Sequence, residues 1–142
     1  MTVKDLLDEK GRETIFLDAS DTVDKAIATM TERNVSAVLV RKNSRTAGIF
    51  TERDVLRAYR RWPEQFSTVL LEQAMSADLI VAEPEEDLCA VMSVMIEKRI
   101  RHMPVMEQGK VAGMLSIRDV VKTQVGNLKS EIHHLKDYLS GI

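Results

Sequence analysis

The sequence predicts a mixed α/β (α+β) fold, in which two tandem copies of one β-α-β-β-α unit pack about a pseudo-twofold axis and a C-terminal helix follows them. The first observation is an internal match: a shift of 65 residues places Ile15 on Ile80 and continues without a gap until Val55 falls on Val120. The second is that each copy has apolar residues at helical spacing, followed by two short β-branched, apolar runs. The third is length, because 142 residues suit two small units that share one interface.

The match indicates an internal duplication. A shared rhythm of apolar residues would produce some similarity by chance, but it does not explain identical glycine, arginine and aspartate residues within one seven-residue window. These identical pairs are Gly48/Gly113, Arg53/Arg118 and Asp54/Asp119.

The elements follow in the same order in both copies. A short extended stretch (15–17 or 80–82) precedes a helix, and two strands joined by a polar turn come next, as expected for a β-hairpin. A second helix begins after Thr51 or Ser116. In the first copy, the first helix is predicted from Val23, Ala26, Ile27 and Met30, and the hairpin strands are 35–40 and 47–50. In the second copy, the first helix is predicted from Leu88, Val91, Met92 and Met95, and the hairpin strands are 100–106 and 112–115.

Three segments make up the predicted domain organisation. Residues 1–62 hold an amphipathic N-terminal helix and the first repeat. Residues 63–122 hold a linking helix, from about 65 to 75, and the second repeat. Pro63 separates the two, because proline cannot continue a helix. Residues 123–142 form a C-terminal amphipathic helix.

Apolar residues of the C-terminal helix recur at alternating spacings of three and four, which is typical of a coiled-coil seam. They are Val125, Leu128, Ile132, Leu135, Leu139 and Ile142. Two interpretations remain open: the seam joins two chains, or the helix folds back onto its own module. In both, this helix is the expected element for contact with a partner or for a homodimer.

Composition argues against several classes of function. The net charge is −2 and aromatic residues are 4%, so neither a basic surface nor a stacking platform for nucleic acid is expected. No apolar run approaches the roughly 20 residues of a membrane span. Cys89 is the only cysteine and the N-terminus does not resemble a signal peptide, so we expect a cytoplasmic protein. Phosphate-loop, nucleophile-elbow and metal-ligand patterns are absent, so we expect no enzyme activity and no metal.

The strongest local motif is glycine, two apolar residues, threonine or serine, two further residues and aspartate, at 48–54 and 113–119. One interpretation is a helix capping box, in which the hydroxyl and the acid three residues later each bind a backbone N–H. A second is compatible with it, because a helix N-terminus suits a phosphate and a carboxylate can accept from both ribose hydroxyls. The motif therefore predicts two mononucleotide sites.

Two further features accompany this motif: the β-α-β-β-α order of both copies and, in the second hairpin, the run Arg101-His102-Met103-Pro104-Val105. On these three features the chain resembles a CBS domain pair, also called a Bateman module, over residues 10–125. The resemblance implies a regulatory ligand of adenosine type: AMP, ADP, ATP, a dinucleotide such as NAD(H), or S-adenosylmethionine. It also implies that each cleft between the repeats borrows residues from the opposite copy.

The resemblance assigns roles to individual residues. The two aspartates, Asp54 and Asp119, would hold ribose hydroxyls, and Thr51 and Ser116 would contact ribose or phosphate. The arginines that precede the aspartates add positive charge at Arg53 and Arg118. The Asp54 cleft would also use Ile49, Ile80, Ile100 and Arg101, and the Asp119 cleft Met114, Ile15, Val35, Ser36 and Ala37.

The two sites are expected to differ. Arg101 and His102 would face phosphate groups, whereas the first copy has Ser36 and Ala37 at the equivalent positions. One rival interpretation is a structural or dimerisation module with degenerate clefts, whose function rests on the C-terminal helix. Another is a small enzyme that uses the cleft, which the absence of a paired base and nucleophile argues against. The sequence names neither the adenosine ligand nor the regulated partner.

Overall fold

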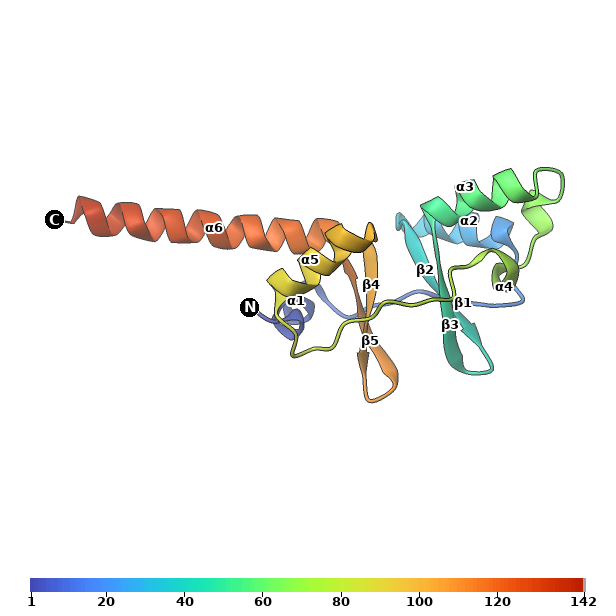
Figure 1. Ribbon diagram of the computed structural model, residues 1–142, viewed down its shortest axis with the longest axis horizontal. Helices are drawn as coiled ribbons and strands as arrows, with labels where there is room; N and C mark the ends of the chain where they lie inside the picture. The colour runs from blue at the N-terminus through green and yellow to red at the C-terminus, as the bar shows by residue number, and fades with distance from the viewer. Residues whose placement is uncertain (142) are drawn as a thin grey trace. The chain divides into compact units, whose positions relative to one another are not determined.

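The computed structural model describes residues 1–141, which form two compact units. The first unit comprises residues 13–80, and the second comprises residues 1–12 together with the chain from residue 81 onward. Figure 1 shows the elements in the order α1 to α6.

The first unit contains a three-stranded sheet, two longer helices and two short helical segments. Strand β1 pairs in parallel with β2, and β2 pairs antiparallel with β3. Both residues of the β2–β3 turn, Asn43 and Ser44, have positive φ angles, as the tight turns of two-residue hairpins require. The elements are β1 (Phe16–Asp18), α2 (Val23–Arg33), β2 (Ala37–Lys42), β3 (Arg45–Thr51) and α3 (Glu52–Arg61).

The core of this unit lies between α2 and the sheet. Val23, Ala26 and Met30 of the predicted helix face are buried, as their spacing predicts. They belong to one apolar cluster with Val38 and Phe50 of the hairpin. The predicted order of elements in the first copy is therefore confirmed.

The prediction of one linking helix at 65–75 is wrong. This segment forms a short 3-10 helix, η1 (Phe66–Thr68), and a single-turn helix, α4 (Leu71–Ala74), with extended backbone at Val69 and Leu70 between them. The carbonyl of Val69 accepts a hydrogen bond from the N–H of Val23, 2.8 Å away. This tertiary bond requires an extended segment, so it outweighs the local helical pattern.

The second unit repeats the helix, hairpin and helix arrangement. Its hairpin turns at Gln108 and Gly109, both with positive φ, as the sequence predicts. The predicted strand at 80–82 is reduced to a single parallel bridge between Ala82 and Val105. The elements are α1 (Val3–Lys10), α5 (Leu88–Lys98), β4 (His102–Glu107), β5 (Lys110–Ser116) and α6 (Ile117–Ser140).

Helix α1 packs in the second unit, although it precedes the first repeat in the sequence. The N–H of Val3 donates to the carbonyl of Glu86 at 2.9 Å, and the side chain of Leu7 lies against Gly113. The division predicted from the sequence placed residues 1–10 with the first repeat and residues 63–80 with the second. The structure exchanges both segments.

Helix α4 has the same role in the first unit that α1 has in the second. The N–H of Leu71 donates to the carbonyl of Asp21 at 2.8 Å, which matches the bond from Val3 to Glu86. Met75, directly after α4, lies against Gly48. Each unit is thus completed by a short helix that precedes the other repeat in the sequence.

Helix α6 is one continuous helix of 24 residues. Only its first turns contribute to the core, where Val120 is buried. Beyond residue 124 every described residue is exposed, so the helix does not fold back onto its own unit (Figure 1). The last predicted seam residue, Ile142, lies outside the described residues. None of the helices in the described part of the chain combines the length and apolarity needed to cross a membrane.

Candidate functional site

In the first unit, the motif forms the N-terminus of α3. The hydroxyl of Thr51 accepts a hydrogen bond from the N–H of Asp54, and Oδ2 of Asp54 accepts one from the N–H of Thr51 at 3.0 Å. This reciprocal pair is a capping box, so that interpretation of the motif is confirmed here. The cap satisfies two of the backbone N–H groups that a helix N-terminus leaves without intrahelical partners.

The Asp54 carboxylate is buried, with 2% of the residue exposed. Its other oxygen, Oδ1, accepts a hydrogen bond from the hydroxyl of Ser76 at 2.9 Å. The guanidinium of Arg57, one turn further along α3, lies 3.5 Å from the same oxygen. All of these partners belong to the first unit, so Asp54 joins the segment after α4 to the start of α3.

In the second unit, the equivalent residues form the N-terminus of α6 with different partners. Oγ of Ser116 accepts a hydrogen bond from the N–H of Asp119 at 3.1 Å. The Asp119 carboxylate accepts a hydrogen bond from Nζ of Lys10, at the end of α1, at 2.8 Å. The Asp119 side chain is 36% exposed, so this carboxylate is far more open to solvent than that of Asp54.

The surroundings of Asp119 lower the pKa of its carboxyl group. Burial raises this pKa, but the hydrogen bonds from Lys10 and Ser116, together with the positive charges of Lys10 and Arg118, lower it by more. The pKa therefore lies below the ordinary value of 3.8, and Asp119 is ionised at neutral pH. It can accept hydrogen bonds but cannot donate one.

Each unit brings the start of its hairpin beside the capped helix. In the first unit Ala37 pairs with Thr51, and the carbonyl of Ser36 accepts a hydrogen bond from the N–H of Glu52 at 3.1 Å. The predicted residues of one copy thus converge at a corner formed by β2, β3 and α3.

The corner of the second unit has the same geometry and more charge. His102 pairs with Ser116, and the carbonyl of Arg101 accepts a hydrogen bond from the N–H of Ile117 at 2.8 Å. The side chain of Arg101 is exposed beside the first turn of α6. Ser36 and Ala37 supply no charge at the equivalent positions of the first unit, so the two corners are chemically unequal.

The other predicted residues lie elsewhere in their units. Ile15 and Val35 pack against the core of the first unit, and Ile100 packs against that of the second. The remaining predicted site residues differ in exposure: Met114 is half-buried, Ile49 is largely buried, Ile80 is partly exposed, and Arg53 and Arg118 are exposed. The prediction that each site combines residues of both repeats stays a prediction.

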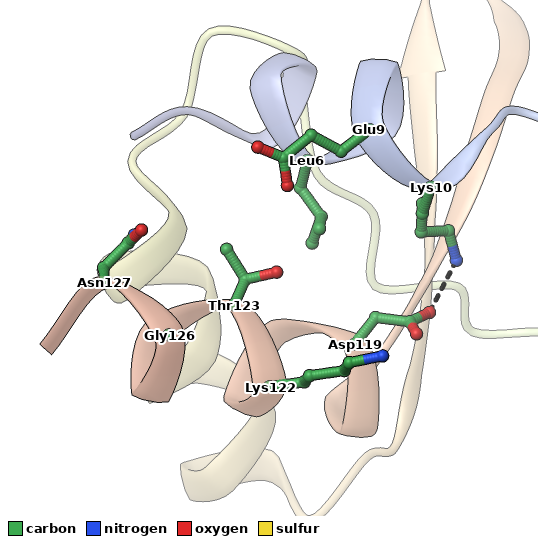
Figure 2. Close-up of a pocket in the computed structure, with 8 residues that line it drawn as sticks. All are labelled: Leu6, Glu9, Lys10, Asp119, Lys122, Thr123, Gly126 and Asn127. Carbon is green, nitrogen blue, oxygen red and sulfur yellow. Dashed lines mark hydrogen bonds and ion pairs between the residues drawn. The ribbon is translucent and has the colours of Figure 1, made fainter. Parts of the chain in front are cut away.

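A hollow of about 360 Å³ lies between α1 and the first turns of α6, as Figure 2 shows. The Lys10–Asp119 hydrogen bond lies at its edge. Its walls carry charges of both signs. The lining residues are Leu6, Glu9, Lys10, Asp119, Lys122, Thr123, Gly126 and Asn127.

Sequence patterns did not identify Lys10 and Ser76, which bind the two aspartates. The sequence carries a signal for the two segments but not for these side chains: a shift of 68 residues places Leu7 on Met75 and makes α1 equivalent to α4, but it places Asp8, not Lys10, on Ser76. The ungapped match at 65 residues starts after α1 and therefore does not detect it. Among the described residues, no group of three or more His, Cys, Asp or Glu side chains could hold a metal ion.

Comparisons with known proteins agree on one family. A family model described as "CBS domain" matches residues 2–61 and 71–126. The chain is 33% identical to the CBS domain-containing protein CBSX3, mitochondrial, of Arabidopsis thaliana, over 99% of this chain and 72% of that protein.

Solved structures show the same fold. The CBS-domain containing protein ATU1752 from Agrobacterium tumefaciens superposes with a TM-score of 0.84 and 33% identity, covering 87% of this chain and 99% of that one. The CBS domain pair of protein MJ0100, solved with 5′-methylthioadenosine and S-adenosylmethionine, superposes with a TM-score of 0.78. At 20% identity, over 89% of this chain and 98% of that one, this last likeness is one of fold.

Proposed function

This chain belongs to the CBS-domain family, and we propose that it is a regulatory module that binds an adenosine-type nucleotide such as AMP, ADP, ATP or NAD(H). It contains two CBS domains in tandem. CBS-domain proteins of this kind are generally regulatory rather than catalytic. A CBS pair of the same fold is solved with two adenosine compounds, which supports the ligand class.

The observation that carries the proposal is the corner of the second unit. A hydroxyl-capped helix N-terminus, an ionised carboxylate and an exposed arginine lie together there, at Ser116, Asp119 and Arg101. Backbone N–H groups and the positive end of the α6 dipole attract phosphate, and Arg101 adds a full charge. An ionised carboxylate accepts several hydrogen bonds at once, so Asp119 can keep Lys10 and still hold ribose hydroxyls.

We assign the stronger binding to the corner of the second unit. In the first unit, Asp54 is buried and already accepts hydrogen bonds on both oxygens, and no charged residue stands where Arg101 does. By resemblance to CBS pairs, residues of the opposite repeat would complete each site around the adenine. Binding would act by favouring one arrangement of the chain over another, which a partner protein could read.

A second candidate function is a structural module with degenerate nucleotide sites. The hydrogen bonds of Asp54 favour this candidate, because both oxygens of its carboxylate already accept hydrogen bonds from the protein without a ligand. This candidate expects no saturable nucleotide binding at either corner.

Thermal unfolding of the purified chain with AMP, ADP, ATP, NAD, NADH and S-adenosylmethionine separates the two candidates. A ligand at 100 times its dissociation constant stabilises the folded state by about 2.7 kcal/mol, which raises the midpoint measurably. Arg101→Ala should reduce the shift, and Arg45→Ala, in an exposed residue of the other hairpin, should keep it. Extraction of the purified protein with acid, followed by chromatography, shows whether it already carries a nucleotide. If no ligand shifts the midpoint of nucleotide-free protein, the proposed function is wrong.

A further inference from the structure

An apolar stripe runs along the exposed face of α6. Its residues follow the alternating spacing of a coiled-coil seam and begin at Val121, four residues before the predicted seam. Between 42% and 67% of each residue is exposed. A continuous exposed apolar stripe of this kind marks an interaction surface. The described members are Val121, Val125, Leu128, Ile132, Leu135 and Leu139.

We infer that this stripe binds the same stripe of a second copy of the chain, in a parallel two-stranded coiled coil. The residue types favour this arrangement. Placing the stripe on the a and d positions of a heptad puts Val125, Ile132 and Leu139 at a, and Val121, Leu128 and Leu135 at d. The central heptads have Val125 and Ile132 at a with Leu128 and Leu135 at d, which is the combination that favours parallel dimers. Val121 and Leu139, at the two ends of the stripe, depart from it.

The charges that flank the stripe select the parallel orientation. Lys122, Lys129 and Lys136 occupy the e positions, and Glu131 occupies a g position. In a parallel dimer a g residue faces the e residue five positions further along the other chain, so Glu131 faces Lys136 of the second copy, twice per dimer. In an antiparallel dimer the e positions face each other, which would oppose lysine to lysine.

The fold prepares α6 for this pairing. The first turn of an isolated helix is costly to form in water, because it fixes several residues for a single hydrogen bond. Here the first turn is already formed, since Ser116 caps it and Val120 is buried in the core. The hollow against α1 is lined by Asp119, Thr123 and Gly126, which lie on other heptad positions, so α1 leaves the stripe uncovered. The stripe extends over about 27 Å.

The oligomeric state of the full chain tests the interface. Sedimentation velocity over a range of concentrations should show a dimer. Leu135→Glu should weaken the dimer about tenfold or more, because it places an unpaired charge in the apolar seam. Ser130→Glu adds the same charge on the outer face and should leave the dimer unchanged. A monomer at all concentrations, or a Leu135→Glu variant that dimerises like the original chain, would overturn the inference.

Two further measurements test the orientation. Glu131→Lys and Lys136→Glu should each weaken the dimer, and the double variant should restore it, because the opposite charges again face each other. With Cys89 replaced by serine, Leu139→Cys should form a disulfide-linked dimer under mild oxidation, and Ser130→Cys should not. Failure of Leu139→Cys to cross-link would overturn the parallel arrangement, since only that orientation places the two 139 positions together.

Discussion

Nζ of Lys10 lies 2.8 Å from Oδ2 of Asp119, although 109 positions separate the two residues in the sequence. The equivalent carboxylate of the other repeat, Asp54, binds Ser76 instead. Lys10, at the end of α1, and Ser76, just after α4, both belong to the segments that the two units exchange. The exchanged segments thus supply each aspartate with a different partner: the ammonium group of Lys10 for Asp119 and the hydroxyl of Ser76 for Asp54.

The Lys10–Asp119 pair predicts a measurable titration. We expect the pKa of the Asp119 carboxyl to lie below 3.8, and to rise towards or above that value in Lys10→Met. Because folding lowers this pKa, Asp119 stabilises the fold at pH values above 3.8, and this contribution is lost as the pH falls through the lowered pKa. Carboxyl titration followed by NMR measures the shift. Lys4→Met, on the same helix, should leave the pKa of Asp119 unchanged.

The two equivalent glycines predict unequal costs. A Cβ at Gly48 would lie 2.7 Å from the backbone oxygen of Ser76, which pairs with Ile49 and cannot move freely. A Cβ at Gly113 would meet only the end of the Leu7 side chain, which can turn aside. We expect Gly48→Ala to lower the free energy of unfolding by about 2–3 kcal/mol and Gly113→Ala by about 1 kcal/mol.

Urea denaturation measures both values. Gly126→Ala is the matched control, since nothing lies within 4 Å of that Cβ in the exposed helix, and it should stabilise the protein by about 0.5–1 kcal/mol. Equal losses at the two buried glycines would contradict the packing described for Ser76.

The exchanged helices predict that a substitution in either helix acts on the repeat that this helix does not directly precede in the sequence. Leu7 and Leu71 are both fully buried, so replacing either with alanine should cost about 2–5 kcal/mol. Leu7→Ala should loosen the 102–116 hairpin and Leu71→Ala the 37–51 hairpin. Hydrogen exchange with peptide-level mass spectrometry distinguishes them. If Leu7→Ala increased exchange mainly in 37–51, the assignment of α1 to the second unit would be wrong.

The proposed nucleotide site predicts a selective effect of Arg101. If its guanidinium faces phosphate, Arg101→Ala should weaken binding of AMP or ATP about tenfold, equivalent to about 1.4 kcal/mol, and leave adenosine binding unchanged. Isothermal titration calorimetry with nucleotide and nucleoside measures the difference. Equal weakening of both ligands would assign Arg101 a role in the shape of the corner rather than in charge recognition.

Local patterns allowed most elements of the fold to be predicted. The spacing of Val23, Ala26 and Met30 predicted α2, and the Gln108-Gly109 pair predicted the second hairpin turn. The threonine and serine of the repeated motif were correctly expected to begin helices. These features depend on residues close together in the sequence, where propensity and periodicity act directly.

The exchanged segments could not be predicted in the same way. α1 and α4 are short, and their pairing with Glu86 and Asp21 depends on contacts far apart in the sequence. The same reason hid the partners of Asp54 and Asp119. Sequence spacing identifies which residues can cap a helix, but tertiary packing decides which further groups reach them.

The exchange of α1 and α4 also affects the order in which the chain can fold during synthesis. Residues 13–80 are contiguous, so this unit can be completed while the ribosome is still making the rest. The second unit needs residues 1–12, which are made before the first unit, and its strands and last helix, which are made after it. Residues 1–12 must therefore wait, with the apolar side chains of Val3, Leu6 and Leu7 uncovered, until the chain from residue 81 onward has been made. During this interval the uncovered apolar segment is open to aggregation and to chaperone binding.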